Sequence, residues 1–307
     1  LGAVDPDRLD MPPDEPILIL LSDFENEDEN MAFAQRILVD VVVPAFRATH
    51  DTKHQAALAY AIQELLKYCK FTPALLEASA PTRVPEKVRQ RWSTLPEMLL
   101  PTLLPLLNSR YVVQQTEPRP REMPLYAHST SYRDWVQAWT LWLIRSSRPG
   151  DAASLFHIFT SVVRDHDVGI AQYLLPHLVL HILISGSSQQ RRTVLGESLA
   201  VLADQAHPAL GYEPERRRLT AQTLFHVLDH VGHWMRRMRL VPLRMARRSR
   251  WRDALSDVQA IMDELSPDLL AQASLQCDAY ARALLHFEYR IRCLLYTSPS
   301  PRDVEES

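Results

Sequence analysis

Glycine is scarce in this sequence: 7 of 307 residues, about 2%, against roughly 7% in average proteins. So few glycines argue against Gly-rich phosphate loops and against β-architectures built on tight turns. Hydrophobic residues make up 46% and charged residues 23% of the chain, which provides for a large core and excludes disorder as the main state. Because this composition argues against both disorder and β-architectures, it favours helix.

Cysteine and long apolar runs are also lacking. Cys69, Cys277 and Cys293 show no CxxC spacing, which argues against a disulfide framework or a zinc site and fits a reducing compartment. The sequence has no run of about 18 apolar residues and no signal-type start. The net charge of −3 gives no general attraction to nucleic acid or anionic membranes. We expect a soluble, intracellular protein with no membrane contact.

Enzyme motifs are absent as well. The sequence contains no GxxxxGK[ST], GxGxxG or GxSxG motif and no His-Arg-Asp kinase loop, and the Asp-Phe pair in Ser22–Glu25 lacks the following Gly. We therefore expect no catalytic, cofactor-binding or metal-binding residue in this chain.

Helical periodicity runs through most of the sequence. Residues 1–30 hold ten acidic residues against Arg8 and predict an acidic, loop-rich segment. From Met31 the apolar residues recur at helical spacing, and about ten helices with short links follow. Because single helix pairs cannot bury their apolar faces alone, residues 31–265 predict an all-α solenoid of irregular HEAT-like pairs. A globular helical bundle is the alternative.

Capping residues predict where several helices begin. Asp51 or Thr52 precedes the second helix, and Ser131 with Asp134 opens a strong one. The remaining predicted pairs of cap and helix are Asp151 before Ala152–Arg164, Asp167 before Gly169–Ser185, and Ser266 before a single helix Pro267–Arg292.

Three groups of histidines are candidates for chemistry. His226, His230 and His233, with Asp229 between them, share one helix face at metal-ligand spacing, but solvated or hydrogen-bonded positions are the favoured interpretation. His177 and His181 lie in the most apolar helix, where we expect hydrogen bonds to a neighbouring helix. The run Asp165–Asp167, with His166, is interpreted as a helix end and the next cap.

Aromatic and basic residues are also clustered. Trp135, Trp139 and Trp142 predict a core stripe rather than a ligand pocket. Eleven arginines against one acid lie between Arg216 and Arg252. They are interpreted as solvated interhelical residues, as a partner of the acidic segment 1–30, or as a weak nucleic-acid contact. The arginines assigned to that contact are Arg236, Arg237, Arg239, Arg244, Arg247, Arg248 and Arg250.

Several short segments, in order along residues 1–292, resemble the ATR-type checkpoint kinases of the phosphatidylinositol 3-kinase-related kinase family. The resemblance rests on Leu1–Asp10, Ala59–Leu66, Leu107–Tyr111, Tyr173–Leu178, Gln222–Phe225 with Leu228–His230, and Ser274–Ala283 with His286–Glu288. It places the chain in the helical region that precedes and enters the FAT domain, so that residues 266–293 would form the first helix of a FAT-type region. Residues 294–307 have no counterpart and resemble translated cloning adaptor, so we expect a non-native tail.

The resemblance implies a non-catalytic scaffold fragment of a large nuclear serine/threonine kinase that acts in the DNA-damage and replication-stress checkpoint. The kinase lobes, with their ATP and Mg ligands, would lie C-terminal of this chain, and ATR-interacting protein and coated single-stranded DNA would be its partners. The alternatives are a stand-alone HEAT-type scaffold or adaptor without enzymatic activity, and another kinase of the same family.

Overall fold

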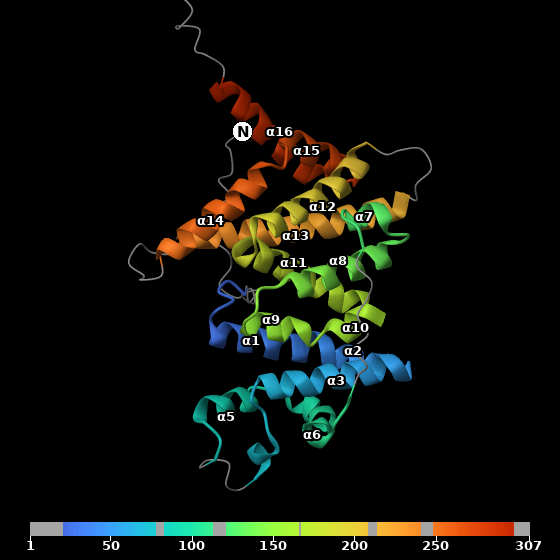
Figure 1. Cartoon of the computed structure of the whole chain (residues 1–307), viewed down its shortest axis with the longest axis vertical. Coiled ribbons are helices and arrows are strands. Elements are labelled where there is room, and N and C mark those ends of the chain that lie inside the picture. Colours follow the sequence, from blue (N-terminus) through green and yellow to red (C-terminus); the bar gives the residue numbers. More distant parts are fainter. Residues whose placement is uncertain are drawn as a thin grey trace, which may run out of the picture.

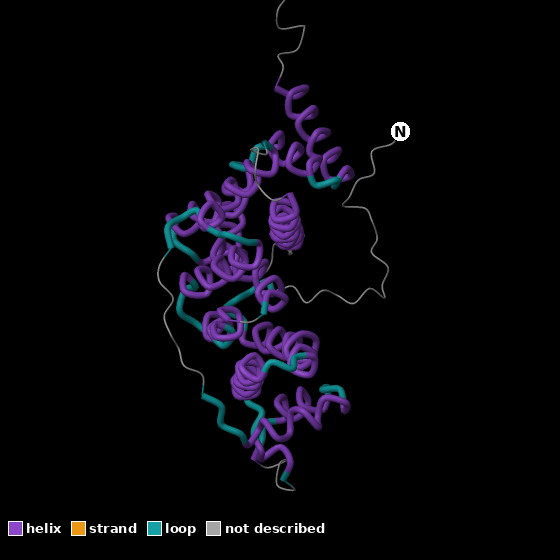
Figure 2. Tube along the Cα trace, turned by 90° about the vertical axis from the view of Figure 1, so that its right-hand side faces the viewer, coloured by secondary structure: helices purple, strands orange, loops and turns teal. Residues whose placement is uncertain are grey.

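The computed structural model describes residues 21–77, 83–112, 121–165, 167–207, 214–240 and 248–297. Within these ranges it contains helices and no strand (Figure 2). The helices lie in successive layers along the long axis, from α3, α5 and α6 at one end to α15 and α16 at the other (Figure 1). The predicted all-α solenoid is confirmed. The described part has more helices than the ten expected, because several of the predicted helices are divided.

The first layers are built from residues 27–108. Their elements are α1 (Glu27–Ile37), the π-helical turn η2 (Leu38–Val42), α2 (Val43–Ala48), α3 (Thr52–Tyr68), η3 (Pro73–Leu76), α5 (Glu86–Ser93), η4 (Glu97–Leu99) and α6 (Leu100–Asn108). Pro44 lies in the first turn of α2 and has no N–H group to donate. The chain nevertheless continues without a break from α1 into α2 through the π-helical turn that directly precedes α2.

The central and last layers follow from residue 125 onward. Their helices are α7 (Leu125–His128), α8 (Tyr132–Ser146), α9 (Asp151–His157), α10 (Thr160–Asp165), α11 (Val168–Ser185), α12 (Ser188–Ala206), α13 (Pro214–Leu240), α14 (Arg248–Asp263), α15 (Pro267–Gln276) and α16 (Tyr280–Thr297). Helix α11 packs against α8 on one side and against α13 and α14 on the other.

Most predicted N-caps are confirmed. The side chains of Asp51, Ser131 and Asp167 accept hydrogen bonds from backbone N–H groups of the first turn, with Ser131 Oγ 3.1 Å from the N of Asp134. Asp151 is different, because it is the first residue of α9 and Gly150 occupies the N-cap position. The single helix Ala152–Arg164 is also wrong, since the chain divides there into α9 and α10. Of the Asp165–Asp167 run, His166 lies outside the described residues.

The boundaries at the two ends differ from prediction. Helix α1 starts at Glu27 rather than Met31, because the side chain of Asn26 caps it. The single helix Pro267–Arg292 is wrong: it breaks after α15, where Asp278 adopts the left-handed conformation with φ 59°. Helix α14 starts at Arg248, and α16 continues to Thr297, past the predicted boundary at Cys293. The non-native origin of residues 294–307 stays a prediction.

The core runs along the middle of the solenoid. Trp135 and Trp139 are fully buried with ring centroids 5.2 Å apart, and Trp142 is half-buried against the same cluster, which confirms the core stripe. Helix α11 is long and apolar enough to cross a membrane by length and composition, yet most of it is buried between α8, α13 and α14. Its apolar composition is explained by this central position.

Residues 21–26 connect the N-terminal layer to α13. Leu21 and Phe24 are buried in the core, and the indole Nε1 of Trp234 donates to the carbonyl of Ser22 at 3.2 Å. The carboxylate of Glu29 accepts hydrogen bonds from the backbone N of Ser22 and Asp23. The end of the predicted loop-rich segment is therefore part of the packed structure.

Candidate functional site: a histidine-lined cavity

A cavity of about 360 Å³ lies between α1 with η2, α11 and α13. It brings His177 of α11 together with all three histidines of α13. The residues that line it are Arg36, Asp40, Tyr173, Pro176, His177, His226, Asp229, His230, His233 and Arg236. His177 thus meets histidines that are 49 or more residues away in the sequence.

His177 is the buried histidine of this cavity. It is 8% exposed, its ring centroid lies 4.6 Å from that of Phe33 and 4.5 Å from that of His230, and its Nδ1 has no hydrogen-bond partner in the described part of the chain. Burial lowers the pKa of His177 well below its usual value, and the nearby His230 and His226 add to the effect. The ring is therefore neutral at pH 7.

His230 lies one helical turn from His226 and faces His177. Burial, followed by the influence of His226 and His233, lowers its pKa to about 4, and its Nε2 has no partner among the described residues. His226 and His233 are exposed at the edge of the cavity. Burial, Arg236 and Arg237 lower the pKa of His233. The cavity thus combines buried neutral imidazoles with exposed basic groups.

Both carboxylates of the cavity are engaged in ion pairs. Asp40 pairs with Arg36 one turn away, and Asp229 makes a two-pronged pair with Arg282 of α16, whose Nη1 lies 2.7 Å from Oδ1. The guanidinium of Arg282 also stacks over the ring of Phe225. Asp229 therefore serves the packing of α16 on α13. Within the described ranges, no group of three or more His, Cys, Asp or Glu side chains could hold a metal ion.

His181 lies outside the cavity. Its ring is buried edge-on against Phe24 at 4.7 Å and near Phe156 at 5.9 Å, and neither ring nitrogen has a hydrogen-bond partner in the described part of the chain. The predicted hydrogen bond to a neighbouring helix is wrong for His181, because aromatic rings surround it instead. Burial, with a contribution from Arg148, lowers its pKa to about 4.

The arginine-rich stretch separates into buried and exposed parts. Arg216 is buried, stacks over the ring of Tyr126 and donates to the Tyr126 carbonyl at 2.7 Å. Arg236, Arg237 and Arg239 are exposed in the last two turns of α13, and Arg239 donates to Gln259 of α14. Arg244 and Arg247 lie outside the described residues, and Arg248 and Arg250 lie in the first turn of α14. The nucleic-acid contact stays a prediction.

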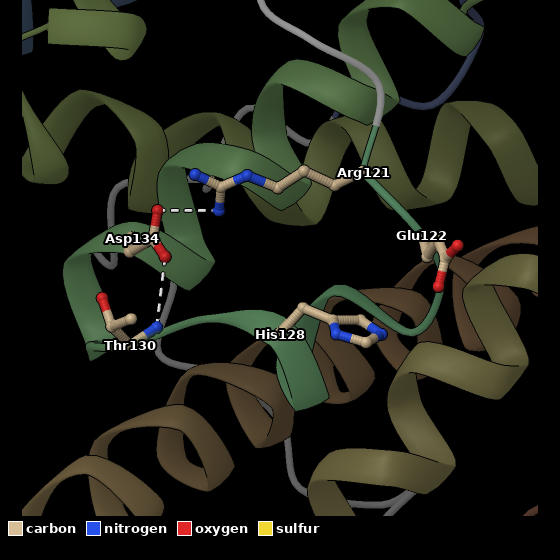
Figure 3. A pocket seen from close by; sticks show the side chains of 5 residues that line it. All are labelled: Arg121, Glu122, His128, Thr130 and Asp134. Atoms are coloured by element: carbon tan, nitrogen blue, oxygen red, sulfur yellow. Dashed lines mark hydrogen bonds and ion pairs between the residues drawn. The ribbon is translucent and has the colours of Figure 1, made fainter.

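A second hollow, of about 640 Å³, lies beside the start of α8 (Figure 3). It is lined by Arg121, Glu122, His128, Thr130 and Asp134. The Asp134 carboxylate accepts from Arg121 Nη1 at 2.8 Å and from the backbone N of Thr130 at 3.2 Å. These bonds hold residues 121–130 against α8, so this hollow has a structural explanation.

A buried carboxylate, Glu197 of α12, is the main polar feature that the sequence analysis missed. It is fully buried and accepts from the backbone N of Leu125 at 2.6 Å, the backbone N of Tyr126 at 2.8 Å and Nε1 of Trp135 at 2.7 Å. Burial raises its pKa despite these bonds. Nothing in the pattern of α12 marks this Glu, because its partners lie 62 to 72 residues away.

Comparison with known proteins identifies the region to which this chain corresponds. A family model described as serine/threonine-protein kinase ATR, M-HEAT region, matches residues 119–300. The chain belongs to the ATR kinase family. The match includes the layers from α7 to α16, and therefore the helices α11 and α13 that form most of the cavity wall.

Individual relatives in the ATR family match almost the whole chain. Protein kinase rad3 of Schizosaccharomyces pombe is 28% identical over 95% of this chain, and serine/threonine-protein kinase ATR of Oryza sativa subsp. indica is 28% identical over 95%. Serine/threonine-protein kinase MEC1 of Candida glabrata is 23% identical over 94%. The chain spans 13%, 11% and 12% of these relatives, and the matched region of the family is a HEAT region rather than a kinase domain.

Proposed function

We propose that this chain is the non-catalytic scaffold segment of an ATR-type checkpoint kinase that acts in the nucleus in response to DNA damage and replication stress. The observation that carries the proposal is the match of residues 119–300 to the M-HEAT region. On this proposal the parent protein is an ATP- and Mg-dependent serine/threonine kinase whose catalytic lobes lie outside the M-HEAT layers, and residues 266–293 would begin its FAT-type region. ATR-interacting protein is the proposed partner.

The layered fold supports a mechanical role. Each layer packs chiefly on its neighbours. A force applied at one end, or a displacement caused by a bound partner, is therefore passed through contiguous helix pairs to the other end. Helix α16 at one end carries an exposed apolar face, with Leu284 63% exposed and Leu285 60% exposed. Exposed apolar faces of this kind are typical of surfaces that pack against another element or protein.

The proposal is tested by exchange of segments with the fission-yeast relative. In rad3, the matching segment would be deleted or replaced by residues 21–297 of this chain, and growth under replication stress would be measured. We expect the deletion to abolish survival and the chimera to restore at least part of it, while a kinase-dead chimera does not survive. Survival of the deletion strain would contradict a scaffold role for this segment.

A direct assay tests the non-catalytic part of the proposal. The purified 307-residue chain, incubated with MgATP and a Ser/Thr substrate peptide, should transfer no phosphate above a no-protein control. Phosphotransfer that copurifies with the chain through two independent purification steps would contradict it.

A further inference from the structure

We propose that the cavity between α1, α11 and α13 binds a phosphoryl group carried on a compact apolar or aromatic body. The inference is independent of the scaffold role, because it rests on the charges, hydrogen-bonding atoms and walls of this one site.

The first argument is the balance of charge in the cavity. Its two carboxylates, Asp40 and Asp229, are each paired with an arginine, Arg36 and Arg282. Arg236 pairs with no carboxylate within the described residues, and its guanidinium folds back toward Gly232, with Nη1 3.6 Å from the position that a Cβ there would occupy. The cavity thus has one uncompensated guanidinium, the group that binds phosphate oxygens in a two-pronged way.

The second argument is the set of histidines around the cavity. His226 and His233 line it with exposed rings, so they can donate to a phosphoryl group directly. His177 lies beneath them, 8% exposed, with its ring centroid 4.5 Å from that of His230. The His177 Nδ1 and the His230 Nε2 have no partner in the described part of the chain and are closed to solvent, so these two rings bound the site rather than supply its first donors.

The third argument concerns size and shape. A cavity of about 360 Å³ is larger than a phosphate ion requires, and the remaining wall is formed by Tyr173 and Pro176. The Tyr173 ring is stacked against Phe33 with centroids 6.1 Å apart, so this wall packs against the core. An apolar or aromatic body attached to the phosphate would pack there. Two sources have this chemistry, a free phosphorylated molecule and a phosphorylated side chain of a protein.

Calorimetric titration of the 307-residue chain tests the site with defined probes: phenyl phosphate, inorganic phosphate and phenol. We expect saturable binding of phenyl phosphate, weaker binding of phosphate and none of phenol. Arg236→Gln should weaken phenyl phosphate binding roughly tenfold or more, the effect of losing one charge-assisted pair. Arg237→Gln is the matched control, because Arg237 is exposed on the same turn and does not line the cavity. Its affinity should stay within about twofold of wild type, as expected for a charge outside the site.

Two further measurements keep the outcome decisive. The thermal unfolding midpoint of R236Q must equal that of the wild-type chain. In nuclear magnetic resonance spectra, the ring signals of His177 and His230 should shift when phenyl phosphate is added. Equal losses in R236Q and R237Q, or binding of Zn²⁺ without binding of phenyl phosphate, would overturn the proposal. A phosphotyrosine peptide that binds more tightly than phenyl phosphate would assign the source to a protein partner, and weaker binding to a small molecule.

Discussion

At the residue scale, buried polar groups decide how the middle layers fit together. The Glu197 carboxylate holds the backbone of α7 and the indole of Trp135, while Arg216 and Asp204 hold Tyr126 from its other sides. Three helices, α8, α12 and α13, therefore meet around the short helix α7. Such a network is stable only while every member is satisfied.

Replacement of Glu197 tests this network. Glu197→Ala leaves three buried N–H donors without an acceptor, and we expect it to lower the free energy of unfolding by about 3–5 kcal/mol. Urea unfolding measures the change. Glu264→Ala, at an exposed position, is the control and should have little effect. A loss in E197A no larger than in the control would show that the network contributes nothing.

Buried histidines make stability depend on pH. The pKa of His181 in the folded chain is about 4, below its ordinary value of 6.5, so the unfolded chain binds more protons between these values. This contribution to stability is complete above pH 6.5 and is lost as the pH falls toward 4. Between pH 7 and 5.5 we expect His181→Phe to lose about 1 kcal/mol less stability than wild type. A slope in H181F equal to that of the wild-type chain would contradict the argument.

At the element scale, the junction of α11 and α12 shows how short links fix the angle between helices. Ser187 and Gln190 form a capping box, and Gln190 Nε2 also donates to the carbonyl of Ser146 at the end of α8. A Cβ on Gly186 would lie 2.5 Å from the carbonyl oxygen of Ile182, whereas a Cβ on Gly196 would meet nothing within 4 Å.

The two glycines give a matched pair of substitutions. Gly186→Ala should destabilise the chain by about 1–3 kcal/mol, because a backbone oxygen cannot move without disturbing the end of α11. Gly196→Ala should stabilise it by about 0.5–1 kcal/mol, since Ala favours helix over Gly in the exposed middle of α12. Thermal unfolding of both variants checks the prediction. Equal effects of the same sign would refute it.

At the scale of the whole molecule, the layers differ in how fully they are enclosed. Helix α11 packs on α8, α13 and α14, whereas α16 packs chiefly on α15 and exposes Leu284 and Leu285. Residues 21–26 add a long-range link, because Ser22 accepts a hydrogen bond from Trp234. In a solenoid, stability is approximately the sum of such nearest-neighbour contacts.

Hydrogen exchange measures this gradient directly. We expect the backbone amides of α11 to exchange most slowly of the described helices and those of α16 to exchange by local opening at a much lower free energy. Mass spectrometry of peptic fragments resolves the two helices. Equal protection of α11 and α16 would show that the chain unfolds as one cooperative unit instead.

The sequence by itself determined the local features. Helical periodicity located the core stripe of Trp135 and Trp139, and the caps at Ser131 and Asp167 were predictable because each bonds to an N–H three residues away. The break at Asp278 was not predictable, because an Asp in the sequence does not mark a left-handed conformation in the way that a Gly does.

Only the tertiary structure decided which distant residues meet. It paired Asp229 with Arg282, surrounded His181 with Phe24 and Phe156, and placed Glu197 beside α7. It also assembled the histidine-lined cavity from α1, α11 and α13, with His177 against His230. The physical reason is that periodicity and capping act over one helical turn, whereas these contacts depend on how the layers stack.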